Sequence, residues 1–172
     1  MKVGILGGRF DPPHLGHLAA AKFAQKRYDL DEVWFVPCNK GNLRKDLLTS
    51  AHDRVRMLKL LTNNNFRVSE LDIIRGGTTY TIDTIRDLKK KYPRVQFYFI
   101  VGEELVSELP RWKKWEKLKK EIKFLKVKKQ GFKKIPKISS SLIREKVKKG
   151  LSIKGMVTEG IEHYIDKHKL YK

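Results

Sequence analysis

Two histidines three residues apart, His14 and His17, are the residues whose types and spacing most clearly suggest chemistry. They follow a short apolar run and two glycines, Gly7 and Gly8, and they open an amphipathic stretch. A strand, a glycine turn and a helix start offer backbone N–H groups and a positive helix end to a phosphate. Both imidazoles can face one anion, and Gly16 between them leaves room for a flat ring or a ribose. The pattern predicts a nucleotide-phosphate site.

Two other interpretations of this segment stay open. Paired glycines and an Asp-Pro-Pro sequence are also common where a tight turn simply precedes a helix. A His-x-x-His pair could supply half of a zinc site, but zinc needs about four ligands, or three and a water. The single cysteine, Cys38, brings no second ligand cluster, so we expect no protein-bound metal.

Residues 7–17, GGRFDPPHLGH, resemble the Gly-x-Phe-Asp-Pro-x-His-x-Gly-His signature of the nucleotidyltransferase superfamily. The superfamily is related to class I aminoacyl-tRNA synthetases, and its members attach an adenylyl or cytidylyl group to a small phosphate or acid. The resemblance implies that His14 and His17 are catalytic. It implies ATP binding for Gly7, Gly8, Phe10, His14, Gly16 and His17.

A second segment, residues 75–84, is similar to the Ser-Tyr-Thr-x-Asp-Thr signature of nicotinate mononucleotide adenylyltransferases. It forms a loop that ends on a helix start, where free N–H groups suit a carboxylate. We expect Thr79, Tyr80 and Thr81 to bind the mononucleotide. An ordinary loop with a threonine cap at Thr81 is the alternative.

A third segment contains Gly102 and Glu104 at a strand end, followed by Trp112 and Trp115. The family has a similar Gly-x-Asp and a Trp-x-x-Trp-like stretch, which implies ATP contacts for Gly102 and Glu104. Glu104 stands where the family usually has aspartate. An indole can stack on a pyridine ring, so we expect Trp112 to stack on the mononucleotide and Trp115 to pack in the core.

The last segment, residues 138–144, resembles the superfamily's Ile-Ser-Ser-Thr-x-Ile-Arg motif, with Ser141 in place of threonine. Serines at a helix start and an arginine one turn later can bind the β- and γ-phosphates of ATP. We expect ATP contacts from Ile138, Ser139, Ser140 and Arg144, with Arg144 also catalytic. A serine-rich helix cap is the alternative.

Two departures from the family concern the mononucleotide phosphate, for which Arg9, Arg44 and Lys45 are candidates. Arg9 occupies a position that is usually serine or threonine in the bacterial enzymes, and it resembles the opening of archaeal-type nicotinamide mononucleotide adenylyltransferases. Residues 39–45 replace the family's Pro-Pro-His-Lys loop, and Arg44 best matches its lysine.

The charge is strongly positive, at +20 over 172 residues. Residues 111–150 hold 17 basic and 3 acidic side chains, and such a surface attracts polyanions in a salt-sensitive way. A nucleic-acid-binding protein is therefore the alternative from a different class, but no aromatic platform or recognised nucleic-acid motif accompanies these residues. We expect no specific nucleic acid partner.

The remaining composition fits a globular protein in a reducing compartment. One cysteine excludes a disulfide framework, which favours the cytoplasm. No apolar run approaches the roughly 18 residues of a membrane span. We expect one nucleotidyltransferase domain over residues 1–172, with the helical part from about 139 to 172 packing on it. An oligomer is possible.

Apolar runs alternate with helical patterns, which predicts an α/β fold: one Rossmann-like domain with a mostly parallel sheet of five or six strands and helices on both faces. The expected strands are Lys2–Leu6, Glu32–Val36, Arg67–Leu71, Gln96–Val101 and Lys123–Val127. The expected helices are Leu15–Tyr28, Ser50–Thr62, Thr81–Tyr92, Glu103–Leu109, Trp112–Lys119, Ser140–Lys149 and Thr158–Lys167. Ligands bind at the carboxyl ends of such strands.

Together the motifs predict transfer of AMP from ATP to nicotinate mononucleotide in NAD biosynthesis, with Mg²⁺ arriving on ATP. Nicotinamide mononucleotide adenylyltransferase and pantetheine-phosphate adenylyltransferase are the alternatives within the superfamily.

Overall fold

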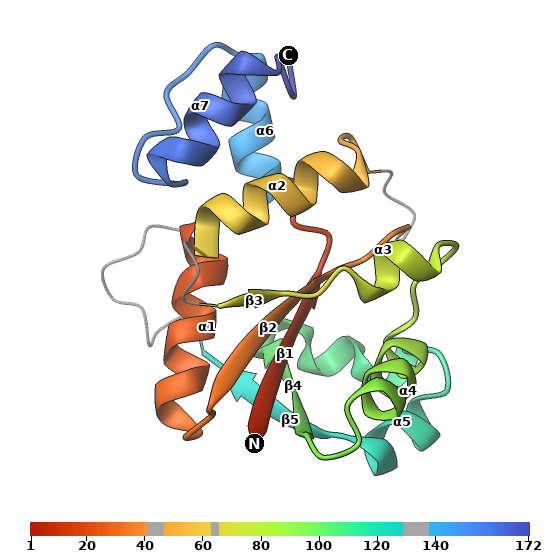
Figure 1. Ribbon diagram of the computed structural model, residues 1–172. Helices are drawn as coiled ribbons and strands as arrows, with labels where there is room; N and C mark the ends of the chain where they lie inside the picture. The colour runs from red at the N-terminus through yellow and green to blue at the C-terminus, as the bar shows by residue number, and fades with distance from the viewer. Residues whose placement is uncertain (41–46, 63–65, 129–137) are drawn as a thin grey trace.

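The computed structural model describes residues 1–40, 47–62, 66–128 and 138–172. Five parallel strands form one sheet in the order β3-β2-β1-β4-β5 (Figure 1). The strands are β1 (Lys2–Gly8), β2 (Glu32–Pro37), β3 (Arg67–Val68), β4 (Gln96–Gly102) and β5 (Lys123–Val127). The parallel α/β fold expected from the sequence is confirmed.

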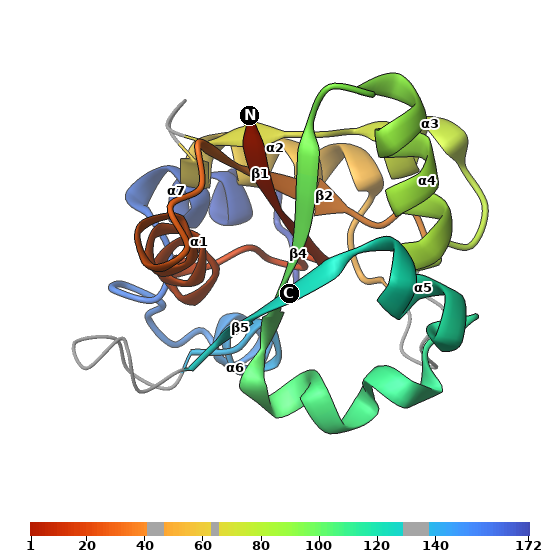
Figure 2. The same ribbon diagram turned by 90° about the horizontal axis from the view of Figure 1, so that it is seen from below.

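Helices cover both faces of this sheet. They are α1 (Leu15–Arg27), α2 (Ala51–Thr62), α3 (Leu71–Arg75), α4 (Thr81–Lys91), the 3₁₀ helix η1 (Glu103–Arg111), α5 (Trp115–Glu121), α6 (Ser140–Lys148) and α7 (Glu159–Lys167). In Figure 2, α1 lies on one side of the strands and α4 and α5 on the other. A hydrophobic core lies on each face of the sheet, and alternate residues of β2 point into the two cores. Phe35 packs with α1 and α2, whereas Trp34 packs with α4 and α5.

The strand order places a topological switch point at the carboxyl ends of β1 and β4. The chain leaves β1 toward β2 on one side and later places β4 on the other, so β1 lies in the centre of the sheet. In open α/β sheets the connections diverge at such a point, and ligands bind there. The segment that follows β1, residues 9–14, is called the β1–α1 loop below, and it begins at this position.

Helix α7 packs against α2, and α6 and α7 lie at the end of the molecule opposite the N-terminus (Figure 1). Ile143 of α6 and Ile161 of α7 are fully buried in the same cluster as Phe10 and Leu58. Helix α6 stops at Gly150, whose φ of 66° is left-handed. The N–H groups of Gly150 and Leu151 donate to the carbonyls of Val147 and Lys146, so this end is a Schellman motif.

Several expected boundaries were wrong. The run Arg67–Leu71 is a strand only at 67–68, because Leu71 begins α3 and its neighbour Asp72 turns inward to bind Thr84. Thr81 does not cap α4, since Tyr80 holds that position.

The segment around η1 also differs from expectation in detail. Residues 103–111 form a 3₁₀ helix, and α5 starts at Trp115 and not at Trp112. Ser50 caps α2 by accepting the N–H of Asp53 at 3.0 Å. Among the described residues, no helix has the length and apolar character that crossing a bilayer requires.

Candidate active site

The β1–α1 loop brings the two predicted catalytic imidazoles into contact. His14 is the last residue before α1, with extended backbone angles, and His17 lies one turn into the helix. Their rings are stacked, with centroids 3.7 Å apart. The ring of Phe10 meets His17 edge-on at 4.9 Å and is itself buried against Phe35. Phe10 therefore supports His17 from the core, and its ring is not presented to a ligand.

One hydrogen bond fixes the chemical form of His17. The backbone N–H of His14 donates to Nδ1 of His17 at 3.2 Å, so Nδ1 must be unprotonated. Burial, and secondarily the neighbouring His14, lower the pKa of His17 well below 6.5. A neutral imidazole that accepts at Nδ1 carries its proton at Nε2. His17 is thus a neutral hydrogen-bond donor at physiological pH.

Gly16 makes room for the imidazole ring of His14. A Cβ atom at position 16 would lie 3.0 Å from both Cε1 and Nδ1 of that imidazole. Side-chain contacts this short are rarely tolerated, so a larger residue would push His14 away. The glycine thus serves the packing of His14 on the helix backbone.

The other predicted glycines also make room for neighbouring side chains. A Cβ at Gly8 would meet the Phe10 ring at 3.1 Å, and one at Gly7 would meet the Phe99 ring at 3.2 Å. At the end of β4, a Cβ on Gly102 would lie 2.6 Å from Oε2 of Glu104. The carboxylate of the exposed Glu104 therefore folds back over the backbone of Gly102.

Asp11 anchors the middle of the β1–α1 loop. Its buried carboxylate accepts the Leu48 N–H at 2.7 Å through Oδ2. Its Oδ1 accepts the hydroxyls of Thr49 and Tyr171, both at 2.7 Å. Because three donors from two distant segments converge on it, Asp11 is an anchor and not a proton acceptor for a substrate.

The start of α6 reaches the same loop with residues that the sequence assigned to ATP. Arg144 donates from Nη1 to the Asp11 carbonyl at 2.7 Å, and Ser140 donates to the Pro12 carbonyl at 2.8 Å. Ser139 caps α6 by accepting the Leu142 N–H, while Ile138 packs against the main core. The structure thus brings Ser140 and Arg144 to the histidine loop.

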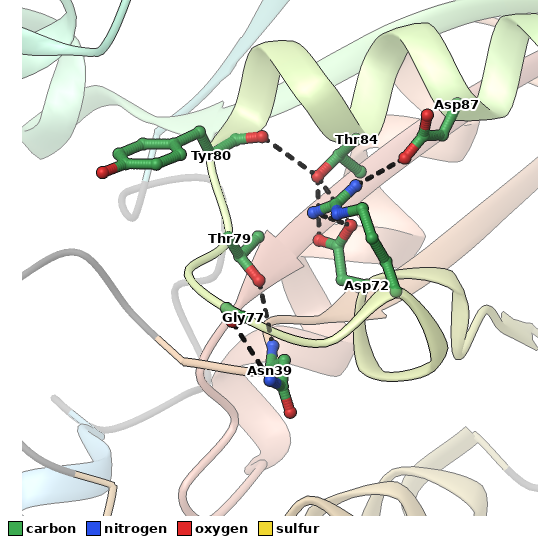
Figure 3. Close-up of polar contacts among 8 residues, drawn as sticks. Asn39, Asp72, Gly77, Thr79, Tyr80, Thr84 and Asp87 are labelled. Atoms are coloured by element: carbon green, nitrogen blue, oxygen red, sulfur yellow. Dashed lines mark hydrogen bonds and ion pairs between the residues drawn. The ribbon is translucent and has the colours of Figure 1, made fainter.

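A second loop, residues 76–80, is fastened to the carboxyl end of β2. The Asn39 N–H donates to Oγ1 of Thr79 at 3.0 Å, and its side-chain amide donates to the Gly77 carbonyl at 3.1 Å (Figure 3). The Thr79 N–H in turn donates to the Lys40 carbonyl at 2.9 Å. These bonds set the position from which α4 begins.

A buried carboxylate fixes the first turn of α4 from behind. Asp72 accepts the Thr84 hydroxyl at 2.8 Å and pairs with Arg75 at 2.8 Å. Arg75 also pairs with Asp87 on α4. The ring of Tyr80 points away from this network (Figure 3). The helix start is therefore held in place independently of any ligand.

Trp112 and Trp115 both pack on aromatic side chains of the sheet. Trp112 meets Phe99 edge-on at 5.7 Å and Phe124 at 6.3 Å, whereas Trp115 contacts Phe124 at 5.3 Å. Trp112 stays partly exposed, so packing and a contact with a ligand are compatible for it. Lys113 lies between the two tryptophans in the sequence, and its ammonium is 3.7 Å from the centre of the Tyr80 ring.

Arg54 is the principal residue that sequence reasoning missed. Its side chain is fully buried. It donates to the carbonyls of Arg9, Cys38 and Asn39 at 2.9, 2.7 and 3.2 Å. Burial lowers the pKa of its guanidinium. Arg54 thereby ties the loop after β1 to the loop after β2. The spacing of Arg54 from Leu58 and Leu61 could have revealed it in the sequence, because this spacing places all three residues on the apolar face of α2.

The predicted phosphate ligands are only partly described. Arg9 lies in the β1–α1 loop and is partly exposed, whereas Arg44 and Lys45 fall outside the described residues. Within the described ranges, no group of three or more His, Cys, Asp or Glu side chains is arranged to hold a metal ion.

Comparisons with known proteins agree with this geometry. A family model described as cytidylyltransferase-like matches residues 5–146. Over 99% of its length, the chain is 40% identical to the "probable nicotinate-nucleotide adenylyltransferase" of Shouchella clausii, 96% of which is covered. The chain belongs to the nicotinate-nucleotide adenylyltransferase family.

Two further similarities extend this result. A family member from Exiguobacterium sibiricum is 37% identical, with 99% of both chains covered. The structure of Plasmodium falciparum nicotinic acid mononucleotide adenylyltransferase complexed with NaAD superimposes with a TM-score of 0.79. That protein is 25% identical to this chain, and 99% of this chain and 97% of the other are covered. The resemblance inferred from the motifs is confirmed at the level of family and fold.

The packing of His14 on Gly16 can be tested by Gly16→Ala. Alanine favours a helix over glycine by about 1 kcal/mol, so the melting temperature should hold or rise. The displaced imidazole should nevertheless lower kcat about tenfold or more. Gly160→Ala in α7 is the matched control, because a Cβ there meets Leu60 at an ordinary 3.4 Å. Equal kcat in the two variants would contradict the interpretation.

Proposed function

We propose that this protein transfers AMP from ATP to nicotinate mononucleotide, giving deamido-NAD and pyrophosphate. A phosphate oxygen of the mononucleotide forms a bond to the α-phosphorus of ATP, and the bond from that phosphorus to pyrophosphate breaks. The observation that carries the proposal is the stacked pair His14–His17 at the carboxyl end of the central strand, in a chain that matches the family over nearly its full length.

The side chains contribute positioning and charge stabilisation, since a phosphate monoester is already a nucleophile near neutral pH. His17 donates from Nε2 to the charge that develops at the α-phosphate, with His14 beside it. Arg144 uses part of its five-donor guanidinium on Asp11 and Ser141, and offers the rest to the leaving pyrophosphate. The first turn of α6, with Ser139 and Ser140, faces the same phosphates.

ATP enters as its Mg²⁺ complex. Magnesium keeps several water molecules and binds substrate phosphates with few protein carboxylates, which suits a described site built from histidine, serine and arginine. We further propose that residues 1–172 act as one domain, because α6 supplies ligands to a site that begins on β1. A single cysteine favours the cytoplasm as the place of action.

Preference for the acid over the amide follows from the surroundings of Tyr80. The start of α4 provides N–H donors and a positive helix end, and Asn39 and Asp72 hold it in place. The ammonium of Lys113 lies over the Tyr80 ring, which adds a positive charge beside the helix start. Trp112 offers its partly exposed indole to the pyridine ring.

Parallel assays with ATP test this function, using nicotinate mononucleotide, nicotinamide mononucleotide and phosphopantetheine as acceptors. A charge-assisted hydrogen bond is worth about 1.5–3 kcal/mol. We therefore expect kcat/KM for the nicotinate form to exceed that for the nicotinamide form at least tenfold, with little turnover of phosphopantetheine. Equal or reversed efficiencies would show that the loop at Thr79–Thr81 has been misinterpreted.

The charge on Lys113 should contribute to this selectivity. Lys113→Gln keeps a long polar side chain but removes the ammonium, and an exposed charge contributes about 0.5–1 kcal/mol. The ratio of acid to amide kcat/KM should fall roughly threefold. Lys117→Gln, an equally exposed lysine on α5, serves as control and should leave the ratio unchanged. An identical ratio in both variants would remove Lys113 from the account.

A further inference from the structure

The segment that follows α7 ends against the β1–α1 loop. The hydroxyl of Tyr171 donates to Oδ1 of Asp11 at 2.7 Å and lies 3.4 Å from Oγ1 of Thr49. This contact joins residues separated by 160 positions. Burial above all, together with the Asp11 carboxylate, raises the pKa of Tyr171. The hydroxyl therefore stays protonated and is the donor in this bond.

Asp11 links Tyr171 to the imidazoles of His14 and His17. Asp11 is only 4% exposed, and each of its carboxylate oxygens accepts at least one donor from another segment. It lies three residues before His14, and Pro12 and Pro13 between them limit the freedom of the backbone. A displacement of Asp11 is therefore transmitted to His14 and, through their stacking, to His17.

The backbone around Tyr171 is held in an unusual conformation. Lys169 and Tyr171 have φ values of 51° and 65°, in the left-handed region that residues with a Cβ rarely adopt. Such conformations persist where surrounding contacts impose them, and they gather at functional sites. The hydrogen bond to Asp11 stabilises this left-handed conformation at Tyr171.

We propose that Tyr171 is a positioning residue for the adenylyl transfer. Through the Asp11 carboxylate it fixes the β1–α1 loop and thereby the two imidazoles. The inference rests on the proposed function for its kinetic consequence, whereas its structural part stands on the contact itself. Loss of the hydroxyl loosens a donor that acts in the transition state, so kcat suffers more than substrate binding.

The test compares Tyr171→Phe with Tyr164→Phe. Tyr164 of α7 is also partly buried, and its hydroxyl donates to Oδ1 of Asp53 on α2 at 2.9 Å. Each substitution therefore removes one tyrosine–aspartate hydrogen bond at the C-terminal helices, but only one touches the loop. We expect kcat of Tyr171→Phe to fall on the order of tenfold with KM values within about twofold. Tyr164→Phe should keep the wild-type kcat, and Tm should fall in both variants.

Amide hydrogen exchange gives a readout that needs no turnover. Exchange at residues 9–17 should be faster in Tyr171→Phe than in wild type or Tyr164→Phe. Unchanged exchange and kcat in Tyr171→Phe, or equal losses in both variants, would overturn the positioning role. If the wild type did not turn over nicotinate mononucleotide, the proposed function would fail, and the exchange comparison would still decide whether Tyr171 orders the loop.

Discussion

The β1–α1 loop must be held from outside, because its backbone has no regular hydrogen-bonding partner of its own. Residues 9–13 contain two prolines and precede the helix, so their carbonyls need donors from elsewhere. Arg54 supplies one to Arg9, Arg144 one to Asp11, and Ser140 one to Pro12. The carboxylate of Asp11 accepts three further hydrogen bonds, from the Leu48 N–H and from the hydroxyls of Thr49 and Tyr171. The position of both imidazoles depends on these long-range bonds.

Such an arrangement suits a reaction in which the substrates bring their own nucleophile and leaving group. The protein contributes donors that are already aimed, and fixed donors need no reorganisation during the reaction. Burial serves two side chains differently. It keeps His17 neutral, so that it donates from Nε2, whereas Arg54 stays the centre of three carbonyl contacts. Both side chains lose contact with water and in return are held in one position.

The sequence predicted those features that neighbouring residues determine. The apolar run before Gly7 and the spacing of His14 and His17 each report on a few adjacent positions, and all five strands were expected. The strand that begins at Arg67 was predicted to be longer than it is, because local apolar character does not reveal that Asp72 must turn inward to meet Thr84.

The residues that sequence reasoning missed act across the fold. Asn39 fastens the loop at Thr79, Tyr171 reaches Asp11, and Lys113 covers Tyr80. No spacing rule brings such pairs together, since the sheet order alone decides which loops become neighbours. Arg54 was the partial exception, because a charge on the apolar face of a helix marks a buried contact.

The protonation state of His17 offers the most direct test of the central claim, that a neutral imidazole is held ready as a donor. Nitrogen NMR of the labelled protein between about pH 5.5 and 8 would report each ring nitrogen, over a range that spans the ordinary histidine pKa. We expect His17 to stay neutral throughout, with Nδ1 unprotonated and Nε2 protonated. A charged ring near neutral pH, or a proton on Nδ1, would contradict it.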